Sequence, residues 1–434
     1  MWEPIRAEFA RRYPGYRGLA PGFGPPTRHH FRHFEAAYGL RPDVFETFHD
    51  DFRVQSCTLA RAMGMFDPDV GTTTHPAVQN LLTGDGTVIK PRYKAKLGDR
   101  HLNTESGELE QRRYDPDAAD YTTWDPDSGK NISIRGIKFG LIFGHLPHVS
   151  NQRMILDVFR VPTGDGGEAA RAVDSITTLV EHLGAGTQGV CWDKAIRGKH
   201  KDQIYDLGLV PIVKTAHAPG GGPKTAQLGM HAFKLGDGTA EQHEVFTQAG
   251  APLVEVIVGG DRVPVILIRR RTRRVGQRTS GYRWYNDYAV PDQPPVPQHL
   301  HGATTSIRLN RSTEHAANHN RAENISATAQ NDPDWDRLYA SRPVAESVNS
   351  LIKRSWYHNL APRVGGARNH FSLLCGSIWL NYKGWIEYQQ HAEHPDSPEP
   401  DTAPPTPTPA TPPVAASDPT ANAPPTRAAR RRAA

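Results

Sequence analysis

The chain of 434 residues contains little cysteine and no long hydrophobic run. Its three cysteines, Cys57, Cys191 and Cys375, are far apart and odd in number, so they predict neither a disulfide framework nor a set of zinc ligands. No apolar run reaches the roughly eighteen residues that a membrane span needs. The first residues also lack the apolar segment of a secretory signal. We therefore expect a soluble protein of the reducing cytoplasm with no membrane partner.

The charge of the chain is only mildly one-sided. Lys and Arg number 51 against 46 Asp and Glu, which gives a formal net charge of +5. This balance is compatible with a polyanion such as DNA, and equally with an ordinary solvated surface. Composition therefore permits a nucleic-acid partner without indicating one.

Changes in composition divide the chain into five parts. Residues 1–77 predict an irregular helical region that could bind the ends of a DNA element, and residues 391–434 are so rich in Pro, Ala and Thr that we expect a disordered tail. Between them, residues 78–215 and 336–390 predict the two parts of one α/β core. Residues 216–335 interrupt that core.

The first part of the core predicts a mixed sheet flanked by helices. Three strands are followed by helix, strand, helix and strand, over residues 81–90, 132–144, 152–162, 168–184, 189–193, 199–208 and 209–214. Successive strands favour an antiparallel meander, and alternation of helix and strand favours parallel pairing. The fold class predicted is therefore α/β.

Residues 216–335 predict a β-rich insertion. The run LVEVIVGGDRVPVILIRRR contains a strand, a Gly-Gly-Asp turn and a strand, which is typical of a hairpin. This run ends in Arg269, Arg270 and Arg271, and Trp284 lies a short distance beyond. Since Arg binds phosphates and an aromatic face can stack on an unpaired base, these residues are candidate DNA contacts. The alternative is that the aromatic residues pack the insertion's own core.

A polar stripe distinguishes the helix predicted to start after Ser341, which could cap it. With 3.6 residues per turn, one face carries Arg342, Glu346, Asn349 and Lys353, while apolar residues occupy the other. A single carboxylate thus stands between two cations and an amide. The alternative interpretation is a solvated face held by charge pairs between neighbouring turns.

Two aspartates are candidate partners for Glu346. Asp85 lies in a predicted strand, where Asp is disfavoured, although flanking glycines would also permit a turn. Asp193 ends the strand GVCWD, where a loop or capping role is the alternative. Ligand groups gather at the carboxyl ends of strands in such sheets, so the three carboxylates could converge. Oxygen ligands of this kind suit Mg²⁺ or Mn²⁺.

These residues carry a resemblance to a known family. Tyr339, Arg342, Glu346 and Lys353 stand in the order and with the gaps of the Tyr-Arg-Glu-Lys signature of bacterial insertion-sequence transposases of the DDE type, in the insertion-sequence-four group. The stretches TGDGTVIKP, CWDKAIRGKHKDQIYDLGLVPIVK and GGARNHFSLLCGSIWLNY are similar to that family as well. The resemblance covers roughly residues 78–390. It implies a ribonuclease H-like core that is interrupted, before the Glu, by a β-rich insertion.

The resemblance also implies an activity. Such enzymes cut DNA at transposon ends and join the freed 3′-OH to target DNA, using two metal ions, Mg²⁺ or Mn²⁺, roughly 4 Å apart. Asp85, Asp193 and Glu346 would hold the ions. The partners implied are double-stranded DNA, as terminal inverted repeats and as target, and a second copy of the chain, because two ends must be paired.

The other signature residues, Tyr339, Arg342 and Lys353, would hold phosphates beside the cut, with Asn349 on the same stripe. Two alternatives remain at this point. One is a ribonuclease H-like endonuclease that cuts DNA and never transposes. The other is a DNA-binding derivative that has lost catalysis.

Overall fold

The computed structural model describes most of the chain: residues 28–125, 129–147, 152–162, 167–215, 224–279, 281–311, 321–356 and 360–393. The chain divides into two compact units, Met1–Tyr388 and Gln389–Ala434, and every strand described below belongs to the first. The predicted tail lies outside the described residues, apart from its first three. Among the helices that the structure describes, none is both long and apolar enough for a membrane span.

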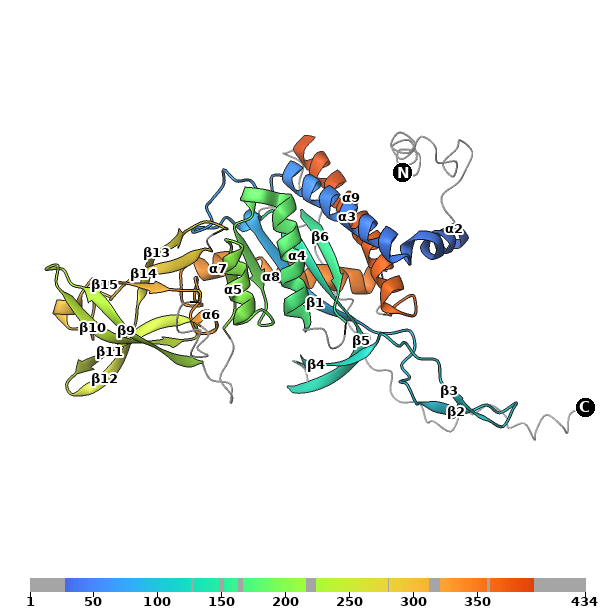
Figure 1. The fold of residues 1–434 in the computed structure, drawn as a ribbon, viewed down its shortest axis with the longest axis horizontal. Coiled ribbons are helices and arrows are strands. Elements are labelled where there is room, and N and C mark those ends of the chain that lie inside the picture. Colours follow the sequence, from blue (N-terminus) through green and yellow to red (C-terminus); the bar gives the residue numbers. More distant parts are fainter. Residues whose placement is uncertain are drawn as a thin grey trace, which may run out of the picture. The chain divides into compact units, whose positions relative to one another are not determined.

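The central sheet is mixed, and the predicted class is correct (Figure 1). Its path runs β4-β5-β1-β7-β8, with β6 beside β5. The strands are β1 (Leu81–Ile89), β4 (Ala119–Asp125), β5 (Lys130–His145), β6 (Arg153–Arg160), β7 (Gly189–Trp192) and β8 (Val210–Val213). Strand β5 pairs antiparallel with β1 and β6, whereas β7 pairs parallel with β1 and β8. The meander and the parallel half both follow the order of elements predicted.

Alternation along the strands gives the sheet two buried faces. Neighbours on β5 illustrate it: Ile142 packs in one cluster with α4 (Gly167–Leu183), whereas Leu141 packs in another with α8 (Arg342–Leu351). Helix α5 (Lys199–Asp206) contributes to the α4 side, and α9 (Gly366–Glu393) to the α8 side. A side chain on β1 or β7 therefore faces either α4 or α8, according to its position.

Within the described residues, the α-helices α2 (Arg28–Phe34) and α3 (Pro42–Ala62) precede the sheet. Helix α3 lies against β6, and both β6 and α9 run beside it in Figure 1. Asp157 of β6 anchors it, since its buried carboxylate accepts from His49 at 2.6 Å and pairs with Arg53 at 3.1 Å. The amide of Asn381 in α9 donates to the Ser56 hydroxyl of α3 at 3.0 Å. The amino-terminal region is thus helical from Arg28 and packed on the core.

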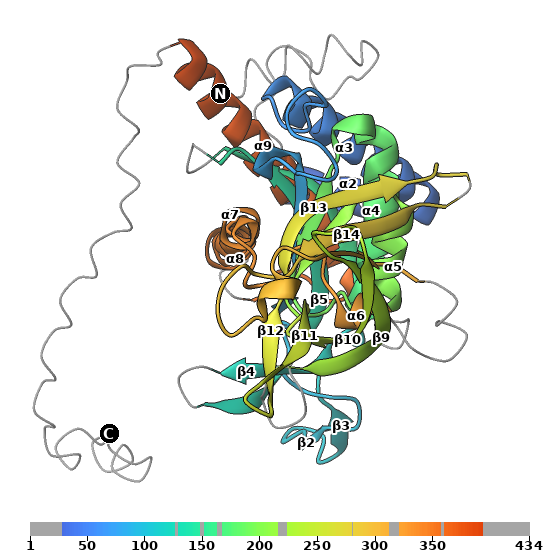
Figure 2. The same cartoon turned by 90° about the vertical axis from the view of Figure 1, so that its left-hand side faces the viewer.

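The β-rich insertion forms a separate seven-stranded sheet, in the order β12-β11-β10-β9-β15-β14-β13 (Figure 2). Its strands are β9 (Thr225–Lys234), β10 (Ala240–Gln248), β11 (Ala251–Val258), β12 (Asp261–Ile266), β13 (Ile268–Val275), β14 (Arg283–Ala289) and β15 (Thr304–Arg308). Val258 pairs with Asp261 across the two glycines, which confirms the predicted hairpin. The short helices α6 (Arg321–Asn324) and α7 (Asp334–Tyr339) lead back to α8.

Two local features differ from the sequence prediction. Ser341 does not cap α8: its own backbone is helical, and its hydroxyl donates to the carbonyl of Leu338 at 2.9 Å. Past Leu351, α8 continues as a π-helical turn over Ile352–Trp356. Strands β2 (Arg100–Leu102) and β3 (Leu109–Gln111), which are short and fully exposed, were not predicted, and neither was β4 of the central sheet.

Candidate active site

Asp85 lies in the middle of β1, with its side chain 14% exposed. Strand β7 pairs with β1 only along Leu81–Thr83, so β1 continues past the end of β7. The Asp85 carboxylate accepts a hydrogen bond from the Asn349 amide at 3.0 Å and lies 3.5 Å from the Arg342 guanidinium. The backbone is extended here, so the turn considered for this position is wrong. The polar stripe of α8 therefore faces the strand aspartate.

Asp193 follows β7 directly and faces the same side of the sheet. Trp192 packs toward α4, so the next side chain points away from it. One carboxylate oxygen of Asp193 accepts from the Ala195 amide at 2.8 Å, which fixes the loop. Burial raises the pKa of Asp193. Burial also raises the pKa of Asp85 to about 6, with a contribution from Asp193 that Arg342 opposes. Two desolvated carboxylates therefore stand close enough to repel each other.

Glu346 occupies a different environment. Its side chain is 62% exposed and forms an ion pair with Arg342, one turn earlier on α8. This is the charge pairing that the sequence offered as an alternative for the stripe. Across the described ranges, no three His, Cys, Asp or Glu side chains are grouped as a metal site. The structure thus brings Asp85 and Asp193 together and leaves the Glu346 carboxylate facing solvent between Arg342 and Asn349.

The donor set beside Asp85 fits a hard divalent cation. Asn349 donates through its nitrogen, while its Oδ1 is buried without a hydrogen-bond partner. The two desolvated carboxylates are hard oxygen ligands whose negative charge a divalent cation would neutralise. Arg342 neutralises that charge in part.

Tyr339 and Lys353 also lie near the aspartates. The Tyr339 ring stacks on Trp335 at 4.6 Å, and the Lys214 ammonium lies 5.0 Å from its centre. Burial, together with the nearby acidic groups, raises the pKa of Tyr339 to about 12. Burial lowers the pKa of Lys353, although the charge of Asp85 opposes the shift. Tyr339, Arg342 and Lys353 therefore lie near the same aspartate, whereas Glu346 does not.

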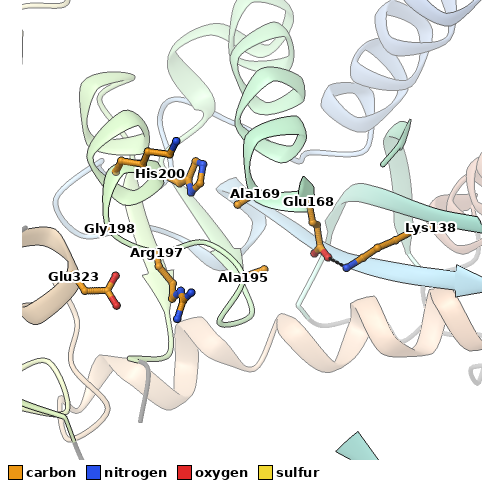
Figure 3. Close-up of a pocket in the computed structure, with 9 residues that line it drawn as sticks. Lys138, Glu168, Ala169, Ala195, Arg197, Gly198, His200 and Glu323 are labelled. Carbon is orange, nitrogen blue, oxygen red and sulfur yellow. Dashed lines mark ion pairs between the residues drawn. The ribbon is translucent and has the colours of Figure 1, made fainter. Parts of the chain in front are cut away.

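Three further residues at the site were missed from the sequence. Glu168, at the start of α4, is 8% exposed and pairs with the Lys138 ammonium at 2.8 Å (Figure 3). The indole of Trp192 donates to the same carboxylate at 3.0 Å. The charge of Glu168 contributes to the raised pKa of Asp85. A buried, paired acid thus stands next to the two aspartates, on the α4 side.

The glycines on either side of Asp85 make this approach possible. A Cβ on Gly84 would lie 1.9 Å from the Trp192 ring, and a Cβ on Gly86 would lie 2.3 Å from the Glu168 carboxylate. Neither glycine has a positive φ, so both serve close packing and not a turn. The Gly-Asp-Gly motif was the signal from which a close neighbour could have been inferred.

The insertion uses its arginines and tryptophan differently from the prediction. Trp284 is completely buried, and its indole donates to the carbonyl of Tyr205 at 2.9 Å, so stacking on a base is wrong and core packing is correct. Arg269 binds Asp332 and Asp334. Arg271 pairs with Asp287 at 2.6 Å, and Arg270 is exposed.

Comparison with known proteins adds no identification: no protein-family model and no curated protein matches the chain.

Proposed function

We propose that this protein is a DNA transposase of the DDE type, which cuts transposon ends and transfers the resulting 3′-OH to target DNA. The observation that carries the proposal is the contact between Asp85 in mid-strand and the Arg342 and Asn349 side chains of the signature helix. A solvated face of charge pairs alone would not direct an amide and a guanidinium at one buried acid.

The topology supports a ribonuclease H-like core for this enzyme. An antiparallel meander of β1, β5 and β6 continues into the parallel strands β7 and β8, with α4 connecting the two halves. Asp85 lies on the central strand, and Asp193 follows its parallel neighbour. The seven-stranded insertion enters between that strand pair and the helix of Glu346. This is the order of parts that the family resemblance implies.

Asp85 and Asp193 would hold the metal ions, and Glu346 would complete the set from its exposed position on α8. Bound Mg²⁺ or Mn²⁺ supplies a water of lowered pKa and stabilises the leaving 3′ oxygen. Arg342 lies between the carboxylates of Asp85 and Glu346, where its guanidinium can hold a phosphate oxygen of the DNA. Asn349 orients Asp85 through the hydrogen bond already formed.

A strand-transfer assay tests the proposal. The substrate is a labelled duplex that carries the terminal inverted repeat next to the gene, incubated with plasmid DNA and Mg²⁺. A transposase cuts the end and joins it to the plasmid, whereas an endonuclease of the same core cuts without joining. Binding that persists in a chelator, with no cutting under any divalent ion, would identify a DNA-binding derivative and refute the proposal. Because two ends must be paired, we expect a dimer on DNA.

A further inference from the structure

A hollow of about 670 Å³ opens beside Glu168, between α4 and the loop that follows Asp193 (Figure 3). We call it the Arg197 hollow. Its charged and titratable lining residues are Lys138, Glu168, Arg197, Lys199, His200 and Glu323. It is not the space between Asp85 and α8, because Glu168 faces the α4 side of the sheet.

The acids of the Arg197 hollow are already neutralised. Glu168 is paired with Lys138 at 2.8 Å, and Glu323 lies 3.4 Å from the ammonium of Lys224. Arg197 and Lys199 differ, since both are exposed and neither forms an ion pair with another described residue. Burial, with the charge of Lys199, lowers the pKa of His200. The hollow therefore offers two cations, Arg197 and Lys199, that are not paired with an acid of the described residues.

The position of the hollow ties it to the aspartates. Asp193 and Arg197 belong to one short loop, which the hydrogen bond from the Ala195 amide to Asp193 holds in place. On the other wall, Glu168 meets Gly86, the residue after Asp85. The charge of Glu168 also contributes to the raised pKa of both Asp85 and Asp193, so an extended anionic chain in the hollow would lie near both carboxylates.

We propose that the Arg197 hollow binds phosphate groups of the DNA strand that leads to Asp85 and Asp193, with Arg197 and Lys199 as the charged contacts. This inference rests on the proposed function, because it names the path of that enzyme's substrate. Exposed cations that face a polyanion contribute to affinity mainly through release of counterions, so their signature is a dependence on salt.

The test measures binding of the full-length protein to a fluorescent duplex with a single-stranded 3′ extension, in a chelator, over a series of salt concentrations. The double variant Arg197→Ala with Lys199→Ala should weaken binding at least about tenfold at low salt and lower the slope of log affinity against log salt by about one to two. A charge-conserving pair, Arg197→Lys with Lys199→Arg, should keep the wild-type slope. Thermal unfolding confirms that each variant is folded.

Lys130→Ala is the matched control. Lys130 is an exposed lysine on the same strand as Lys138, on the order of 26 Å away along β5, and should leave the slope unchanged. A wild-type slope in the double variant would overturn the inference, whether or not the protein cuts DNA. Displacement of the duplex by inorganic phosphate, at matched ionic strength, would also overturn it in favour of a site for free phosphate.

The remaining outcomes separate the inference from the proposed function. If the double variant has a lower salt slope and the wild type cuts DNA in Mg²⁺, the inference about the Arg197 hollow and the transposase proposal both stand. If the double variant loses slope but the wild type never cuts, the hollow binds DNA and the transposase proposal fails. If the wild type does not bind the duplex at all, both fail.

Discussion

Helix α8 and strand β13 each carry a series of charged side chains, and they use them in opposite ways. On α8, Arg342 and Asn349 contact Asp85, a carboxylate whose surroundings favour its uncharged form. On β13, Arg269 and Arg271 contact acids that hold the insertion together. The charges of α8 are thus directed at an incomplete site, whereas those of β13 complete their own ion pairs. This comparison favours the surroundings of α8, and not those of β13, as the site of catalysis.

The largest effect on DNA cleavage should come from replacing Asp85 and Asp193, the two aspartates of the candidate site. Asp85→Asn or Asp193→Asn is expected to reduce Mg²⁺-dependent DNA cleavage to the level of a protein-free control, because a carboxamide cannot replace a carboxylate as ligand. Glu346→Gln should do the same if its exposed carboxylate joins the set. The control is Asp261→Asn, at the exposed hairpin turn. Full cleavage by the Asp85 variant would refute the site.

Trp284→Ala tests the insertion, where we expect the buried contacts to serve stability and not DNA binding. It should lower the free energy of unfolding by roughly 3–5 kcal/mol, because it empties a fully buried site and removes the hydrogen bond to Tyr205. Denaturant titration measures this loss. At a temperature where the variant is still folded, affinity for DNA should match that of the wild type. A selective loss of affinity without loss of stability would restore the base-stacking role.

Arginine truncation should separate the two regions directly. Arg342→Ala should reduce cleavage by about a hundredfold, the order of effect seen when a charged donor is removed from a reacting group. Arg269→Ala should instead cost about 3 kcal/mol of stability, because it leaves the buried carboxylate of Asp332 unpaired. Cleavage per folded molecule should be unchanged for Arg269→Ala. Equal behaviour of the two variants would remove the distinction between α8 and β13.

The two regions should also respond to pH with opposite signs. Asp85 has a raised pKa of about 6, so in the metal-free protein its contribution to stability is present below pH 4 and is lost as pH rises toward 6. For Asp287, burial is outweighed by hydrogen bonds from Arg273 and Arg271, which lower the pKa to about 2. Its contribution is present above pH 4 and is lost as pH falls toward 2.

Thermal unfolding over this pH range measures both effects. Asp85→Asn should flatten the melting temperature between pH 4 and 6, and Asp287→Asn should flatten it between pH 4 and 2. If the melting temperature of either variant still changes with pH over its range, the titrating group is another residue.

The smallest effect is expected from Arg271→Ala. Arg271 is 69% exposed, and Asp287 keeps its bond to Arg273 when Arg271 is removed. The free energy of unfolding should change by less than about 1 kcal/mol. A denaturant titration that finds a larger loss would show that the Asp287 network is more cooperative than its exposure implies.

Much of the fold could be predicted from periodicity. The strands of the meander and the stripe of α8 are regular patterns that each segment carries within itself. Asp85 was identified because an acid in an apolar strand contradicts its surroundings, and the structure places it against Arg342. The short exposed strands β2 and β3 lack such a pattern.

The parts that escaped prediction depend on contacts between distant segments. Glu168 resembles any acid that favours the start of a helix, and only the fold brings it to Gly86. Trp284 stands among arginines as a base-stacking residue would, yet Tyr205 covers it from another element. The exposed orientation of Glu346 could not be predicted either, because helical spacing fixes the face of a residue and not its rotamer.

The short pairing of β7 with β1 has a consequence for the motion of the site. Past Thr83, β1 remains paired with β5 along Thr83–Ile89, but its pairing with β7 on the other side has ended. Along Thr83–Ile89, hydrogen exchange should therefore be slow for the amides of β1 that face β5 and faster for those that face the opposite side. Around Asp85, the central strand would thus be held firmly on its β5 side and more loosely on the other.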